Sequence, residues 1–62
     1  MTRKPPQPAD VIQAAYAHLD VGEHARAEAL FQRVLREKAT RDDPRYVIPA
    51  LRGLSTSLRE RA

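Results

Sequence analysis

The chain of 62 residues has no cysteine, no tryptophan and only two glycines. The absence of cysteine excludes disulfides, iron–sulfur clusters and zinc sites built from thiolates. No stretch approaches the ~20 apolar residues that a membrane-spanning helix needs, and the basic start of the chain is not followed by the apolar core of a signal peptide. We therefore expect no membrane segment and a cytoplasmic location.

Large apolar residues are also scarce. Leu, Ile, Val and Phe together number thirteen, about a fifth of the chain, which lies at the lower border of globular composition. A chain this short buries only ~60% of the surface that its unfolded form exposes, and a catalytic cleft with its supporting shell needs more residues. We expect one domain that is not an enzyme, whose small core is completed by regular helix packing or by another chain.

Charge is distributed unevenly along the chain. Residues 1–23 carry a net charge of −1, whereas residues 24–62 carry +4, and nine arginines stand against two lysines. The excess of arginine together with abundant alanine is typical of a GC-rich bacterial genome. Because acidic residues are interleaved with the basic ones, we expect a solvated helix surface. Binding of nucleic acid is kept as the alternative, and the arginines that would carry it are Arg33, Arg36, Arg41, Arg45 and Arg52.

The first eight residues contain three prolines, which lack amide donors and favour extended backbone. We expect a disordered tail over 1–8 and a single domain over 9–62. Apolar residues then recur at helical spacing, at Val11, Ala15 and Leu19, flanked by Ile12 and Tyr16. Asp10 and Gln13 have the spacing of a capping box, and Gly22 can end a helix in the left-handed conformation. The pattern predicts a helix over 9–20.

Two further helices follow. The second is expected over 24–38, where an apolar stripe recurs at spacings of three and four, at Ala27, Leu30, Phe31, Val34 and Leu35. The link of about three residues before it forces an antiparallel hairpin. Asp43 as N-cap and Pro44 at the first helical position predict a third helix over 45–60, which Pro49 and Gly53 weaken. Because Pro49 disfavours helical geometry at Ile48, we expect an irregular first turn, and a short turn over 44–48 before a helix from Pro49 is the alternative. The expected fold is all-α, an antiparallel helical hairpin plus a third helix.

The hairpin resembles a tetratricopeptide repeat. The resemblance rests on the segment from His18 to Leu35, and its carrying residues are Leu19, Gly22, Ala27, Phe31, Val34 and Leu35. It implies structural roles for three of them: Gly22 makes the tight turn, Ala27 is small where the helices cross, and Phe31 fills the space beside it. The third helix repeats the spacing of the first 36 residues on, against a family period of ~34. It therefore resembles the opening helix of a second repeat.

The resemblance implies a protein–protein interaction module, such as a small adaptor, a chaperone or a docking domain. In the family, first helices line a groove, and the matching residues here are Ile12, Tyr16, Leu19, Asp20, Ile48, Arg52 and Ser55. Ile12 and Tyr16 stand where the family's carboxylate-binding groove has Lys and Asn, so an apolar helix or strand is the expected ligand. The partner is another protein chain, either a second copy or a different protein. For Tyr16 a half-buried core position, with its hydroxyl at the rim, is the alternative.

No residue pattern indicates catalysis, a metal or a cofactor. His18 and His24 are six residues apart with no cysteine and no suitably placed acid, a poor set of ligands for a metal. Ser55, Thr56 and Ser57 have no histidine or lysine base in motif spacing, and the chain has no glycine-rich phosphate loop. We expect no catalytic residue, no metal site and no cofactor.

Overall fold

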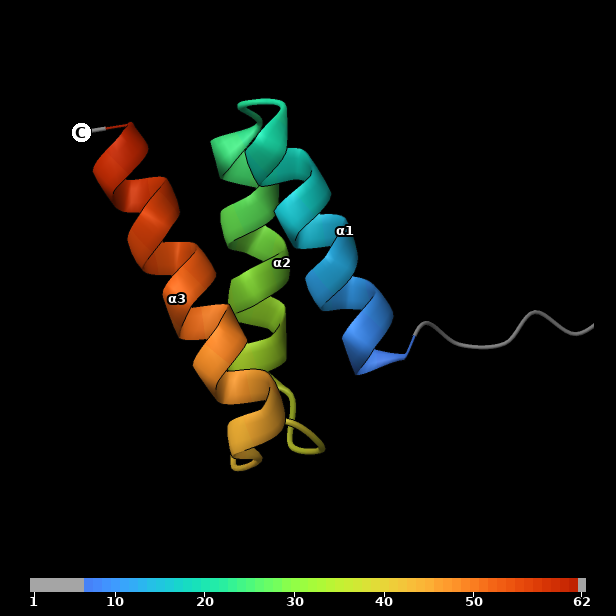
Figure 1. Ribbon diagram of the computed structural model, residues 1–62. Helices are drawn as coiled ribbons and strands as arrows, with labels where there is room; N and C mark the ends of the chain where they lie inside the picture. Colours follow the sequence, from blue (N-terminus) through green and yellow to red (C-terminus); the bar gives the residue numbers. More distant parts are fainter. Residues whose placement is uncertain (1–6, 62) are drawn as a thin grey trace, which may run out of the picture.

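The computed structural model describes residues 7–61, which form three α-helices and no strand. They are α1 (Pro8–Asp20), α2 (His24–Arg36) and α3 (Pro44–Glu60). Helix α2 packs against both neighbours, and α1 also contacts α3 (Figure 1). The expected all-α fold, a hairpin with a third helix packed on it, is confirmed. No helix in the described part of the chain is both long and apolar enough to cross a lipid bilayer.

Helix α1 begins at a proline and not at the expected capping box. Gln7 is the N-cap, without a side-chain hydrogen bond, and Pro8 is the first helical residue. The proline ring fixes φ near the helical value and its missing N–H is not needed there. Asp10 therefore lies inside the first turn, beside the positive end of the helix dipole, and the prediction that it caps the helix is wrong. The expected tail of residues 1–8 lies mostly outside the described residues.

The turn between α1 and α2 is closed by Gly22, whose φ of 81° lies in the left-handed region. The backbone N–H of Glu23 donates to the His18 carbonyl at 2.8 Å, and that of Gly22 donates to the Leu19 carbonyl at 3.1 Å. This pair of bonds is the Schellman arrangement, which satisfies the last carbonyls of a helix. The expectation that Gly22 ends the first helix is confirmed.

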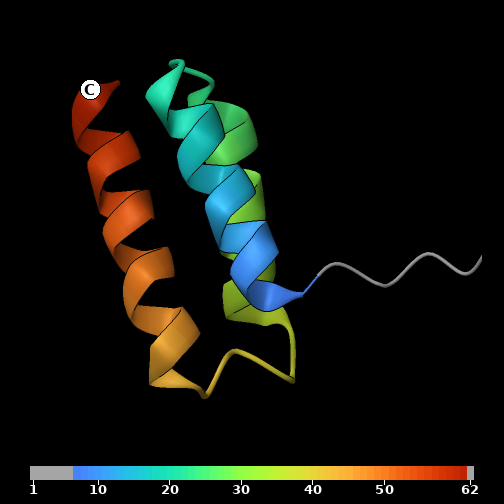
Figure 2. The same cartoon turned by 45° about the vertical axis from the view of Figure 1, so that its right-hand side comes forward.

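Helix α2 ends at Arg36, two residues before the expected end, because a side chain replaces a backbone donor. The hydroxyl of Thr40 donates to the Val34 carbonyl at 2.6 Å, the carbonyl that the N–H of Lys38 would otherwise reach. Glu37 has extended backbone angles, and its own carbonyl accepts from the N–H of Arg41 at 2.8 Å. The connection thus folds back toward the start of α3 (Figure 2).

Helix α3 begins at the predicted cap, but its first turn is helical from Pro44 and not irregular as expected. The Asp43 carboxylate accepts a hydrogen bond from the backbone N–H of Arg45 at 3.0 Å, and Pro44 occupies the first helical position. The same carboxylate binds the Arg45 guanidinium at 2.8 Å. The helix runs through Pro49 without ending. Since proline has no N–H, tertiary contacts have to offset the hydrogen bond lost there.

The core is built around one aromatic ring. Phe31 of α2 is fully buried, and the ring of Tyr16 meets it edge-on with 5.1 Å between the centroids. Gly53 of α3 lies directly against the ring, so that a Cβ at this position would overlap it. The other buried apolar residues are Ile12, Ala15, Leu19, Ala27, Val34 and Ala50. Ile12, and not Val11, therefore shares the buried face of α1 with Ala15 and Leu19.

Gly53→Ala tests this contact. Alanine is the better helix former by ~1 kcal/mol, yet its Cβ would meet the Phe31 ring and force α3 away from α2. We expect a net loss of about 1–3 kcal/mol in the free energy of unfolding, measured by urea denaturation followed by circular dichroism. Ser55→Ala, an exposed change on the same helix, serves as the control and should be neutral or slightly stabilising. A stabilised Gly53→Ala chain would show that the ring can move aside.

The cap of α3 predicts a dependence of stability on pH. The hydrogen bonds from the Arg45 side chain and backbone hold the pKa of the Asp43 carboxyl below its ordinary value. A lowered folded-state pKa contributes stability that is present above the unfolded value, about 3.9, and is lost as the pH falls through the folded value. Asp43→Asn keeps an N-cap oxygen but cannot titrate. Below about pH 4, the native chain should lose more thermal stability than Asp43→Asn, and equal losses would contradict this role.

Candidate protein-interaction surface

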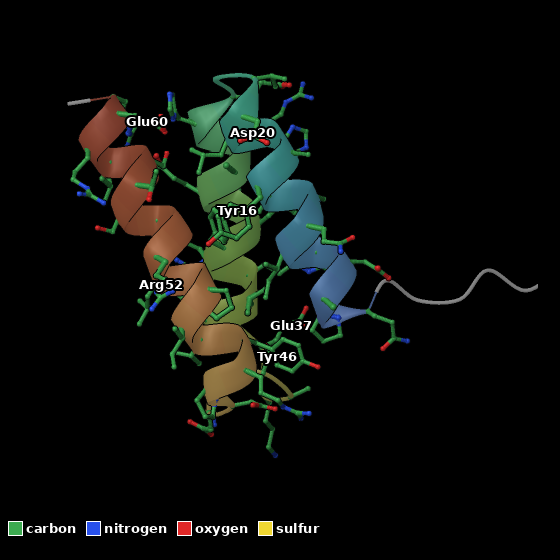
Figure 3. All side chains as sticks on the ribbon, in the orientation of Figure 1. Tyr16, Asp20, Glu37, Tyr46, Arg52 and Glu60 are labelled. Atoms are coloured by element: carbon green, nitrogen blue, oxygen red, sulfur yellow. The ribbon has the colours of Figure 1, made fainter. Side chains whose placement is uncertain are left out.

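The structure does not gather the residues predicted to line a groove onto one surface. Ile12 and Leu19 are buried in the core of the chain itself, where they have no surface to offer a partner. Tyr16 lies in the middle of the bundle, whereas Arg52 lies on the outer side of α3 (Figure 3). Four of the seven predicted residues are exposed to solvent, namely Asp20, Ile48, Arg52 and Ser55.

Tyr16 is occupied by contacts within the chain. Its hydroxyl donates a hydrogen bond of 2.9 Å to the carbonyl of Pro49, which links α1 to α3. Its ring packs edge-on against Phe31, and the side chain is half-buried. These contacts correspond to the alternative of a core position with a polar tip. The hydroxyl also holds α3 close to α1 at the residue where proline weakens the helix.

Helix α3 instead presents large apolar side chains to solvent. Ile48, Leu51 and Leu58 are 50%, 52% and 51% exposed. Val47 and Leu54 are partly buried between them and the core. We call these five residues, Val47, Ile48, Leu51, Leu54 and Leu58, the α3 apolar face. Their spacing, with 47, 51, 54 and 58 separated by four, three and four residues, makes a continuous stripe along the helix.

The fully buried residues of α3 are small, and its larger residues Tyr46 and Leu54 pack against the core only in part. Ala50, Gly53 and Ser57 are buried, and at Gly53 the Phe31 ring leaves no room for a side chain. The sequence pattern joins Ala50 to Val47, Leu51, Leu54 and Leu58 in one stripe, and the structure divides that stripe between the core and the surface. This division is not predicted from the sequence, because Gly53 is expected only to weaken the helix and Ser57 is considered only as a nucleophile. Small residues recurring at 50, 53 and 57 were the available signal.

A buried polar cluster joins the far end of α3 to α2. The hydroxyl of Ser57, fully buried, donates to Glu28 Oε2 at 2.6 Å, and Arg61 Nη2 binds Glu28 Oε1 at 3.1 Å. His24 Nδ1 lies 3.2 Å from the same Ser57 oxygen. Because the single serine proton goes to the carboxylate, His24 acts as the donor through Nδ1–H. No sequence pattern predicted this cluster.

The cluster has the residue types of a hydrolase but not the arrangement. A nucleophilic serine needs its proton taken by a histidine base and an open path to substrate. The Ser57 hydroxyl instead donates its hydrogen bond to the Glu28 carboxylate, and Ser57 has no exposed surface. Among the described residues no group of three His, Asp or Glu side chains is placed to hold a metal ion. The arrangement instead holds α3 against α2 through polar contacts, and we call its four residues, His24, Glu28, Ser57 and Arg61, the polar lock.

Of the five arginines named for nucleic-acid binding, three form local ion pairs within residues 7–61. Arg36 and Arg52 form none there. Arg33 binds Glu37 at 3.0 Å and Arg41 binds Asp42 at 3.6 Å, and Arg45 is held by the α3 cap. These carboxylates reduce the positive potential that a phosphate backbone would meet. No observation on the described residues favours the nucleic-acid alternative over a protein partner.

Ser57→Ala tests the polar lock. The change leaves the buried Glu28 carboxylate and the His24 ring without their shared partner, so we expect a loss of about 1–3 kcal/mol in the free energy of unfolding. Ser55→Ala makes the same chemical change on the exposed side of α3 and serves as the matched control. Urea denaturation of both chains gives the comparison, and equal stabilities would show that the cluster contributes nothing to docking of α3.

Comparisons with protein-family models, with curated proteins and with solved structures find no match to this chain. The resemblance of the hairpin to a tetratricopeptide repeat therefore stays a prediction, carried by Gly22, Ala27, Phe31 and their neighbours.

Proposed function

We propose that the chain is a protein-interaction module, a helical unit of tetratricopeptide-repeat type that binds another protein chain. The observation that carries the proposal is the α3 apolar face, on which Ile48, Leu51 and Leu58 are each about half exposed. Within residues 7–61 only seven apolar residues are buried, whereas α3 alone leaves three large apolar side chains about half exposed. Exposed apolar patches on small proteins commonly mark interaction sites.

The internal contacts of Tyr16 move the proposed binding surface away from the groove that the resemblance implies. A ligand lying between α1 and α3 would have to displace the hydrogen bond from Tyr16 to Pro49 and disturb the ring contact with Phe31. Binding to the α3 apolar face breaks no contact within the chain. Because free energy is gained only by covering surface that is still exposed to water, the outer face of α3 is the better site.

Leu51→Asp tests the proposal. The substitution places a charge in the centre of the α3 apolar face without touching the core, so helical content and the thermal midpoint should stay near those of the native chain. We expect loss of self-association in light scattering, or loss of a partner that co-purifies with the native chain. Ala29→Asp, on the exposed side of α2, is the control and should retain both.

Two results would contradict the proposal. One is a chain that stays monomeric and has no partner depending on Leu51. The other is a partner that is lost equally with Ala29→Asp, because binding would then lie on another surface or respond to added charge anywhere.

A further inference from the structure

The side of the α3 apolar face that points away from the bundle is lined with arginine. Arg45, Arg52 and Arg59 are seven residues apart, and seven residues make almost two turns of an α-helix, so the three lie in a row along it. Arg52 and Arg59 each follow a leucine of the face by one residue. We call this row the arginine edge. The other edge of the face is bounded by the bundle itself, since Ala50 and Ser57 are buried.

The arginine edge is only partly neutralised by the chain. Arg45 is bound by Asp43 at 2.8 Å. Within residues 7–61, Arg52 and Arg59 have no carboxylate within salt-bridge distance, although five other arginines do. Both are exposed. Arg52 stands beside Leu51 in the middle of the face, and Arg59 stands beside Leu58 at its far end. A partner that covers these leucines brings its own side chains within reach of both guanidinium groups.

A second copy of the chain fits this edge poorly. The stripe at 47, 51, 54 and 58 has the same spacing in both directions, so two α3 helices could pair antiparallel with Leu51 against Leu54 of the second copy. In that arrangement the arginine edge of one helix lies beside the arginine edge of the other. Arg52 would meet Arg52 of the second copy, and Arg59 would meet Arg45. Like charges placed together weaken such a pair.

We propose, resting on the function proposed above, that the α3 apolar face binds an amphipathic helix of a different protein whose apolar stripe is bordered by Asp or Glu. Leucines of the partner cover Leu51, Leu54 and Leu58, while its carboxylates, also about seven residues apart, pair with Arg52 and Arg59. The docked helix lies along α3 as a fourth helix. Apolar burial supplies the affinity, and the ion pairs at the rim select the partner and its register.

Two synthetic helical peptides test the proposal. Both carry the same leucine stripe at spacings of four, three and four, and they differ only in having glutamate or lysine along one edge. Binding of each to the full chain is measured by fluorescence anisotropy at low and at high salt. We expect the glutamate peptide to bind about tenfold more tightly at low salt, since two favourable rim pairs replace two repulsive ones. The preference should shrink as salt rises.

Charge reversal provides the second arm. The variant with Arg52→Glu and Arg59→Glu should reverse the preference and bind the lysine peptide more tightly, while Arg26→Glu with Arg33→Glu, on the exposed side of α2, leaves the preference for glutamate unchanged. Leu51→Asp should abolish binding of both peptides. Amide chemical shifts of the native chain on adding the glutamate peptide should change along α3 first.

The outcomes separate the two proposals. Equal affinity for both peptides, with binding lost in Leu51→Asp, overturns the acidic partner but leaves the α3 apolar face as an interaction surface. A stable dimer that depends on Leu51 and excludes both peptides also overturns it, in favour of a second copy. If neither peptide binds a monomeric chain at millimolar concentration, the acidic helix is overturned, and the proposed function then rests on the co-purification result alone.

Discussion

The approach of α3 to α2 depends on the contact between the Phe31 ring and Gly53. One large side chain from α2 fills the centre of the bundle, and where α3 lies directly against its ring there is room only for a glycine. The distance between packed helices is set by the side chains at their contact, so Ala50, Gly53 and Ser57 bring α3 close. No leucine of this helix is fully buried, and Leu51 and Leu58 are about half exposed. The apolar outer face is thus a consequence of how the core is filled.

Much of the fold follows from local patterns. Periodicity places the three helices, Gly22 ends the first and Asp43 starts the third, because each of these signals acts within a few residues. The predictions fail where a residue distant in the sequence determines the local structure. Helix α2 stops early because the Thr40 hydroxyl reaches Val34, and Ser57 finds Glu28 across 29 positions of sequence. The same limit explains the binding residues: periodicity identifies Ile12 and Leu19 as apolar, but only packing shows that they face inward.

The scarcity of large apolar residues has a different meaning once they are placed. A short chain could bury all of its large apolar residues, but here α3 exposes Leu51 and Leu58 to solvent and buries Ser57. The buried serine is satisfied by Glu28 and His24, so polar bonds take part of the role that apolar packing has elsewhere in the bundle. The inner side of α3 is therefore held by the contact with the Phe31 ring and by hydrogen bonds. Its outer side leaves large apolar side chains exposed.

The connection between α2 and α3 has two anchored ends and a middle whose side chains are exposed. Thr40 is anchored through its hydroxyl and Asp43 through the helix that it caps, whereas Arg41 and Asp42 between them are exposed. Exposed loop tips accept insertions because no buried contact is lost, and the entropic cost of a longer loop rises slowly with its length. The Arg41–Asp42 junction is therefore the natural place to insert a peptide tag, a fluorophore or a tether, leaving the bundle and its outer face intact.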